Sequence, residues 1–139
     1  MRLPKTLHDE FVKQVAALEV ASHHHTGSRQ ICPKHADADS DWDVVCLVKQ
    51  LPRIGEAYCG AENPYFESIK IPCDEGVLNI IATEDETFFR LFRVATDVAQ
   101  WLNLTERTDR VNLFRIVLYG MNVRPPVGLN VAVCQEVAQ

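Results

Sequence analysis

Two aspartates at the start of an apolar run constrain the fold of this chain more than any other feature. Asp41 and Asp43 flank Trp42, and residues 44–48, which follow, are all apolar. A continuous run of this kind is typical of a strand buried on both faces, so we expect a strand over residues 43–48. Because side chains alternate along a strand, the two carboxylates point to one side and the indole to the other. The fold must therefore hold two carboxylates side by side where a buried strand begins.

Paired carboxylates repel each other unless a cation lies between them, and a glycine–serine pair upstream adds complementary chemistry. Hard divalent ions such as Mg²⁺ bind carboxylate oxygens together with substrate phosphates. Gly27 allows a phosphate to approach the backbone closely, and the Ser28 hydroxyl can donate a hydrogen bond to it. Together these residues predict a site for a divalent metal ion and a triphosphate.

The acidic stretch that includes these aspartates has two other interpretations. Asp37, Asp39 and Asp41 alternate with neutral residues, as they would in a solvated acidic loop beside a strand. Their spacing also matches positions 1, 3 and 5 of an EF-hand calcium loop. Trp42 stands where that loop needs glycine, and Val48 stands where it needs glutamate, which excludes the calcium loop. The solvated loop remains the alternative to the metal site.

The arrangement resembles the signature of the nucleotidyltransferase superfamily, which includes DNA polymerase beta and the small antibiotic and antitoxin nucleotidyltransferases. That signature is a Gly-Ser pair at the end of a strand, a spacer of about a dozen residues, and Asp-x-Asp opening the next strand. The pair at 27–28, the spacer and the Asp-x-Asp at 41–43 all agree with it. Segments 77–81 and 109–115 are similar to those of small phage-encoded members.

The resemblance implies a nucleoside triphosphate as substrate and two divalent ions, Mg²⁺ or Mn²⁺. These ions lower the pKa of the attacking hydroxyl and neutralise the triphosphate and the leaving pyrophosphate. Asp41 and Asp43 would be catalytic and would hold the metals. Gly27 and Ser28 would bind the β- or γ-phosphate. Arg29 would add a cation there, unless it is an ordinary exposed loop arginine.

One position departs from the family pattern. The superfamily usually supplies a third carboxylate from a neighbouring strand, and Asn79 stands at that catalytic position here. Asparagine can ligate a metal through its carbonyl oxygen but cannot accept a proton. Glu67 would substitute if the sheet placed it beside Asp41, and it is otherwise a solvent-facing strand residue. Either activity is weak, or the base lies elsewhere, or the protein binds nucleotide without transferring it.

Histidines and arginines near the motif have both functional and structural interpretations. His23 and His25 share one face of a strand and would contact phosphate or assist proton transfer, or they form a half-buried strand end. Arg107 and Arg110 flank the start of a helix. They would reach a phosphate or a nucleic-acid backbone, or they belong to a solvated helix face.

Periodicity and turn residues predict the remaining elements. These are a helix over 6–18, a strand over 20–24, a loop or short helix over 29–40, irregular structure over 51–64, a hairpin of strands 66–71 and 77–82, a helix ending near 102, a helix over 108–119 with Gly120 as its C-cap, and a tail from Val123. They fit an α/β (α+β) domain with a mixed three- to four-stranded sheet and helices packed on one face. The resemblance implies the same nucleotidyltransferase-like fold, and residues 1–139 form a single domain.

Composition narrows the classes of partner. A net charge of −5 disfavours a protein that coats nucleic acid, and no strong DNA-binding signature is present. No stretch is long and apolar enough for a membrane span, and the first residues show no signal peptide. Five scattered cysteines without a Cys-x-x-Cys pair indicate reduced thiols. We therefore expect a cytoplasmic protein, in the host cytoplasm if it is phage-encoded.

These observations lead to one principal function and two alternatives. The principal one is a magnesium-dependent nucleotidyltransferase that moves a nucleoside monophosphate to a hydroxyl of a protein, an RNA or a small molecule. The first alternative is a catalytically impaired, nucleotidyltransferase-like binding protein that acts in toxin–antitoxin pairing or phage–host interaction. The second is a structural domain in which the Gly-Ser and Asp-x-Asp spacing is accidental. The acceptor is not readable from the sequence.

Overall fold

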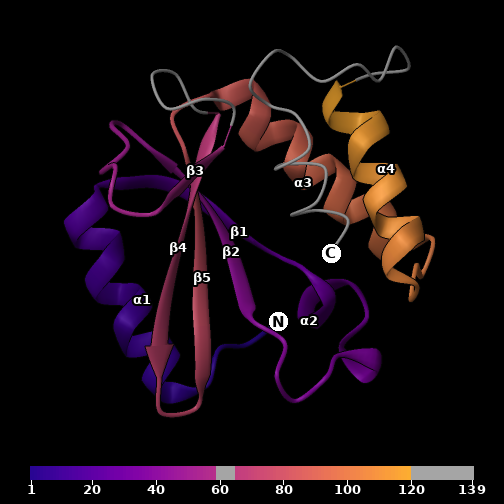
Figure 1. Ribbon diagram of the computed structural model, residues 1–139, viewed down its shortest axis with the longest axis horizontal. Helices are drawn as coiled ribbons and strands as arrows, with labels where there is room; N and C mark the ends of the chain where they lie inside the picture. The colour runs from indigo at the N-terminus through magenta and orange to yellow at the C-terminus, as the bar shows by residue number, and fades with distance from the viewer. Residues whose placement is uncertain (59–64, 120–139) are drawn as a thin grey trace.

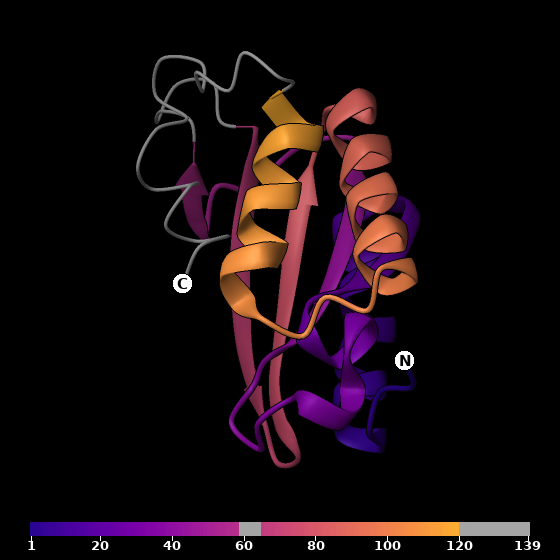
Figure 2. The same ribbon diagram turned by 90° about the vertical axis from the view of Figure 1, so that its right-hand side faces the viewer.

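The computed structural model describes residues 1–58 and 65–119 and contains a five-stranded mixed sheet with helices on both faces (Figure 1, Figure 2). The elements in chain order are α1 (Lys5–Leu18), β1 (Val20–Thr26), α2 (Ser28–Ile31), the 3₁₀ helix η1 (Pro33–His35), β2 (Trp42–Val48), β3 (Glu56–Tyr58), β4 (Phe66–Cys73), β5 (Gly76–Thr83), α3 (Glu86–Trp101) and α4 (Arg107–Tyr119). In space the strands follow the order β1-β2-β5-β4-β3. Strands β2 and β5 are parallel, and the other neighbouring pairs are antiparallel.

Apolar side chains pack in two layers, one on each side of the sheet. Helix α1 covers one side, called the α1 face, and α3 and α4 cover the other, called the α3 face (Figure 2). The layer on the α1 face includes Leu7, Phe11, Val44, Cys46, Leu78 and Ile80. The layer on the α3 face includes Val45, Phe66, Ile81, Phe88, Phe92 and Phe114. Successive residues of β2 and β5 thus enter opposite layers, which explains why both strands are apolar without alternation.

The predicted α+β arrangement with a mixed sheet is confirmed, but two of its details are wrong. The sheet has five strands rather than three or four. The additional edge strand, β3, is only 3 residues long and lies in a segment whose proline and glycine predict irregular structure. Helices cover both faces rather than one, because two strands that are apolar on both sides need cover on both sides.

Several predicted elements are observed with shifted ends, and some lie outside the described residues. Strand β1 continues to Thr26 rather than stopping at 24, and β4 and β5 form the predicted hairpin. Cys32, Cys46 and Cys73 are free thiols. Gly120, the tail and the other two cysteines lie outside the described residues. Among the helices of the described ranges, none has the length and apolarity needed to cross a membrane.

Candidate functional site

Four polar side chains form one row across the sheet. Thr26 on β1 is the Cα partner of Asp43 on β2, Asp43 is the partner of Asn79 on β5, and Asn79 is the partner of Lys70 on β4. Directly opposed residues of neighbouring strands point to the same face. The sheet therefore brings Asp43 and Asn79 together, as predicted from the family pattern, and adds a lysine that the sequence interpretation did not assign to the site.

Asn79 is fixed between an acceptor and a donor. Its Nδ2 donates to Asp43 Oδ1 at 2.9 Å, and its Oδ1 accepts a hydrogen bond from Ser68 Oγ at 2.6 Å. An ionised carboxylate can only accept, so the amide nitrogen of Asn79 must face Asp43 and the Ser68 hydroxyl must donate. In this arrangement Asn79 serves as a hydrogen-bond donor to Asp43, and its carbonyl oxygen is turned toward Ser68.

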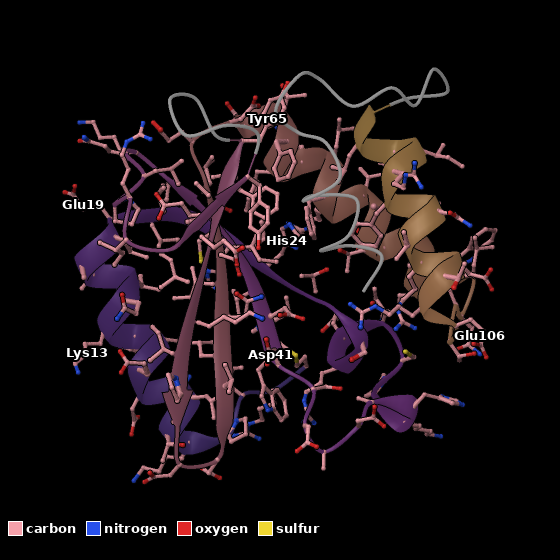
Figure 3. All side chains as sticks on the ribbon, in the orientation of Figure 1. Lys13, Glu19, His24, Asp41, Tyr65 and Glu106 are labelled. Carbon is pink, nitrogen blue, oxygen red and sulfur yellow. The ribbon has the colours of Figure 1, made fainter. Side chains whose placement is uncertain are left out.

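Asp41 is paired with a cation from the neighbouring hairpin. It lies just before β2, on the side of the sheet where α2 lies (Figure 3). Its Oδ2 is 3.4 Å from Lys70 Nζ, and the lysine side chain is 54% exposed. The sequence signal for this contact was the alternation of β4, which places Lys70 on the same face as Ser68. The expected need for a positive charge beside the paired aspartates is met, in part, by the chain itself.

Gly27 is required by the position of Asp43. It joins β1 to α2 with a φ of 77°, a conformation that favours glycine. A Cβ at this position would collide with the Asp43 carboxylate. The Gly-Ser pair and the Asp-x-Asp, which are separated in sequence, are therefore in direct contact in the fold.

A cavity of about 470 Å³ opens on the α3 face beside this row. Five of the six residues predicted for the site line it, namely Gly27, Ser28, Asp41, Asp43 and Asn79. The acidic loop adds Asp37 and Asp39, and α4 adds Arg107 and Arg110. Cavities of roughly 300–1,000 Å³ with a few convergent polar groups are typical of small-molecule sites. Carboxylates and cations thus line one cavity that is large enough for a nucleotide-sized ligand.

Arg29 organises the loop beside the cavity and is not among the residues that line it. Its guanidinium donates to the backbone oxygens of Asp37, Ala38 and Ser40 at 3.1 Å each. It also lies over the Trp42 ring, 4.1 Å from the centroid. These contacts fix the acidic loop in the position from which Asp37 and Asp39 reach the cavity.

The two arginines of α4 differ from an ordinary solvated helix face in that both reach the cavity wall. Arg110 Nη1 donates to the backbone oxygens of Leu104 at 3.1 Å and Thr105 at 2.8 Å, and to Cys32 Sγ at 3.4 Å. These bonds tie the start of α4 to the segment before it and to the segment after α2. The charge of Arg110 is consequently held at the same cavity as the aspartates.

Glu67 is in neither of the places predicted for it. Its side chain is fully buried on the α1 face, since it alternates with Ser68, which faces the cavity. Its carboxylate accepts hydrogen bonds from the backbone amides of Arg53 at 2.6 Å, Ile54 at 3.1 Å and Gly55 at 3.0 Å. Glu67 therefore shapes the segment before β3, and it is wrong both as a partner of Asp41 and as a solvent-facing residue.

We expect Glu67→Gln to lower the free energy of unfolding by about 1.5–3 kcal/mol, the usual contribution of hydrogen bonds to a charged group. In the wild type the backbone N–H groups of residues 53–55 donate to the two carboxylate oxygens. In glutamine an amide nitrogen replaces one of these oxygens, so at least one backbone N–H group would face another donor. Urea denaturation measures the change, and Glu56→Gln on the exposed part of β3 is the control. Equal stability of the two variants would contradict the buried role of Glu67.

The histidine run divides between the two faces and leaves the cavity free of imidazole. The His23 ring packs edge-on against Phe11 of α1 at 5.0 Å and lies 6.1 Å from the His25 ring. His24 is buried on the α3 face, where its Nε2 lies 3.4 Å from the Phe89 carbonyl (Figure 3). His23 and His25 lie on the α1 face, away from the cavity, so the predicted phosphate contact is wrong. His25 is half-buried, as the alternative interpretation predicts, but His23 is exposed.

Burial lowers the pKa of His25 from 6.5 to about 4, and the nearby amino terminus and neighbouring histidines act in the same direction. We expect the free energy of unfolding to decrease as the pH falls from 6.5 to about 4. Over this interval the unfolded chain binds a proton at His25 that the folded chain does not. The contribution of neutral His25 to the free energy of unfolding is therefore fully present above pH 6.5 and lost by about pH 4. Urea denaturation at both ends of the interval should show a smaller loss for His25→Asn than for the wild type. A His35→Asn control at an exposed position should behave as the wild type, and identical losses in all three proteins would exclude His25 as the cause.

Asp41 and Asp43 are the carboxylates of the candidate site that could hold a metal ion. Within residues 1–58 and 65–119, no group of three or more His, Cys, Asp or Glu side chains is arranged to hold a metal ion. Mg²⁺ is commonly bound through one or two carboxylates together with substrate phosphates and water. Asp41 and Asp43, open to one cavity, fit that pattern of binding.

Comparisons of the chain with protein-family models, with curated proteins and with solved structures found no match.

Proposed function

We propose that the chain is a magnesium-dependent nucleotidyltransferase that moves a nucleoside monophosphate from a nucleoside triphosphate to a hydroxyl of a protein, an RNA or a small molecule. The observation that carries the proposal is the contact between the two halves of the motif. Gly27 lies against the Asp43 carboxylate, and both line one cavity with Ser28 and Asp41. Accidental spacing in the sequence would not be expected to converge in this way.

Asp41 and Asp43 would hold Mg²⁺ or Mn²⁺, and the cavity would hold the triphosphate. The metal would lower the pKa of the acceptor hydroxyl and neutralise charge on the leaving pyrophosphate. Ser28 would donate a hydrogen bond from its hydroxyl to a phosphate oxygen, and Gly27 would allow the backbone to approach the phosphate closely. Arg107 and Arg110, which also line the cavity, would attract the polyphosphate and orient it.

In the transfer step the acceptor oxygen bonds to the α-phosphorus while the bond from that phosphorus to the bridging oxygen breaks. Pyrophosphate leaves, and the hydroxyl proton passes to solvent. Asp37 and Asp39, which are exposed at the cavity, would relay this proton to solvent, since Glu67 faces the other side of the sheet. The reaction takes place in the cytoplasm, or in the host cytoplasm for a phage protein, where thiols stay reduced.

The hydrogen bond from Asn79 to Asp43 favours a second function, a nucleotide-binding protein that does not transfer. A donor amide occupies the place of the third carboxylate, so the group that usually completes the site cannot accept a proton. Such a protein would act through binding, as in toxin–antitoxin pairing or in interference between phage and host.

Incubation with each labelled nucleoside triphosphate, Mg²⁺ or Mn²⁺, and a cell lysate separates these functions. Transfer of label to protein, RNA or a small molecule supports the enzyme. Saturable, divalent-dependent nucleotide binding without transfer supports the binding protein. If the protein neither binds nor transfers any triphosphate, both functions are overturned.

A further inference from the structure

Lys70 is the cation that directly contacts one of the two aspartates proposed to hold metal. It projects from β4 into the cavity, next to Asn79 in the polar row, and its ammonium lies 3.4 Å from Asp41 Oδ2. The side chain is 54% exposed, so its four-carbon stem has room to change conformation. Lys70 has no role in the proposed transfer step.

Two of the arginines near the cavity, Arg29 and Arg110, are held by backbone oxygens. Arg29 is fixed by three backbone oxygens and by the Trp42 ring, and Arg110 is fixed by two backbone oxygens. Those bonds would have to break before either guanidinium could move. The Lys70 ammonium instead pairs with a carboxylate that the proposed function assigns to a metal ion. A metal ion that takes this carboxylate would break its ion pair with Lys70.

We propose that Lys70 is an exchangeable counter-ion: it neutralises Asp41 in the free protein, yields that carboxylate to a divalent ion, and then binds a phosphate oxygen of the triphosphate. This inference rests on the proposed function. The exchange suits a lysine, because the ammonium is a compact charge with three rotatable donors that accepts either a carboxylate or a phosphate partner.

The exchange predicts opposite effects of one substitution on two ligands. Lys70→Met removes the competitor at Asp41, so Mn²⁺ alone should bind roughly twofold to fivefold more tightly, the range expected for a largely exposed ion pair. The same substitution removes a phosphate contact. Inorganic tripolyphosphate with Mg²⁺ should therefore bind about tenfold or more weakly, as expected for a lost hydrogen bond between charged groups. Tripolyphosphate is a suitable probe because it tests the phosphate contact without choosing a nucleobase.

Electron paramagnetic resonance titration of Mn²⁺ and calorimetric titration of tripolyphosphate with Mg²⁺ measure the two affinities. Lys13→Met, which removes an equal charge from the exposed ion pair with Glu10 on α1, should change neither. Lys70→Arg keeps the charge and should retain most of the tripolyphosphate affinity. In an Asp41→Asn background, Lys70→Met should no longer improve Mn²⁺ binding, because the pair is already broken.

Each outcome has a distinct meaning. If the wild type binds neither Mn²⁺ nor tripolyphosphate, the proposed function fails and the inference fails with it. If the wild type binds both and Lys70→Met leaves them unchanged, or weakens both, the exchange is overturned while the proposed function stands. An improvement in Mn²⁺ binding that persists in the Asp41→Asn background would reflect the general field of the protein and would also overturn the exchange.

Discussion

We expect Asp43→Ala to abolish the stabilisation that a nucleoside triphosphate and Mg²⁺ together would give the protein under the proposed function. In the wild type, a ligand that binds only the folded state raises its stability by about 2.7 kcal/mol at roughly 100 times its dissociation constant. Asp43 is proposed to supply a metal ligand, and its carboxylate also accepts the hydrogen bond from Asn79 and lies against Gly27. Thermal melts with triphosphate, with and without a chelator, measure the effect.

Two further variants separate loss of the site from loss of the fold. Asp43→Asn keeps the size of the side chain and can still accept from Asn79, yet it removes the charge that a divalent ion requires. It should melt near the wild-type temperature without ligand and should show no ligand-induced shift. Asp74→Ala, at the exposed turn of the β4–β5 hairpin, should keep the full shift. A normal shift in both Asp43 variants would remove this residue from the metal site.

Asn79→Asp raises label transfer by about 10²–10⁴-fold if the wild type is limited by the missing carboxylate, the usual contribution of a positioned general base. The substitution is nearly isosteric, and the Ser68 hydroxyl can still donate to the new carboxylate. The donor to Asp43 is lost, however, and two negative charges then face each other. The variant should therefore be less stable than the wild type without metal and should gain more stability when Mg²⁺ is added.

Transfer of label with each triphosphate, measured for wild type and variant side by side, tests this expectation. Asn103→Asp, at an exposed position after α3, is the matched control and should leave transfer unchanged. Robust wild-type transfer that Asn79→Asp does not alter would mean that the proton acceptor lies elsewhere, with Asp37 and Asp39 as the next residues to substitute. Absence of transfer from both proteins, with any triphosphate or metal, would favour the binding protein.

The sequence predicted the contact between the halves of the motif better than it predicted the surroundings of that contact. Period-two alternation along β4 puts Ser68 and Lys70 on one face and Glu67 on the other. It did not reveal which of those sides would face the aspartates, because that depends on how β4 pairs with β5. Glu67 was consequently assigned to the cavity or to solvent, although three backbone amides draw it into the core on the other side.

Other features were beyond the sequence because they arise from long-range packing. The apolar run of β2 predicted burial on both faces, but nothing local identified α1 as the cover of the second face. Strand β3 is held by its pairing with β4, not by its own residues. The pair between Asp41 and Lys70 joins the loop before β2 to β4. Alternation along β4 shows which face Lys70 is on, but not which acidic residue it meets there.

The polar row also determines which alignment of the central strands is the stable one. A slip of one residue between paired strands exchanges the two faces, and burial normally penalises it because polar side chains would enter the core. Along β2 and β5 that penalty is weak, since Val44, Val45, Ile80 and Ile81 are apolar whichever way they point. A slip would, however, separate Asn79 from Asp43 and turn a polar group toward the apolar layer beneath α1. The residues proposed to do the chemistry therefore also fix the register of the two central strands.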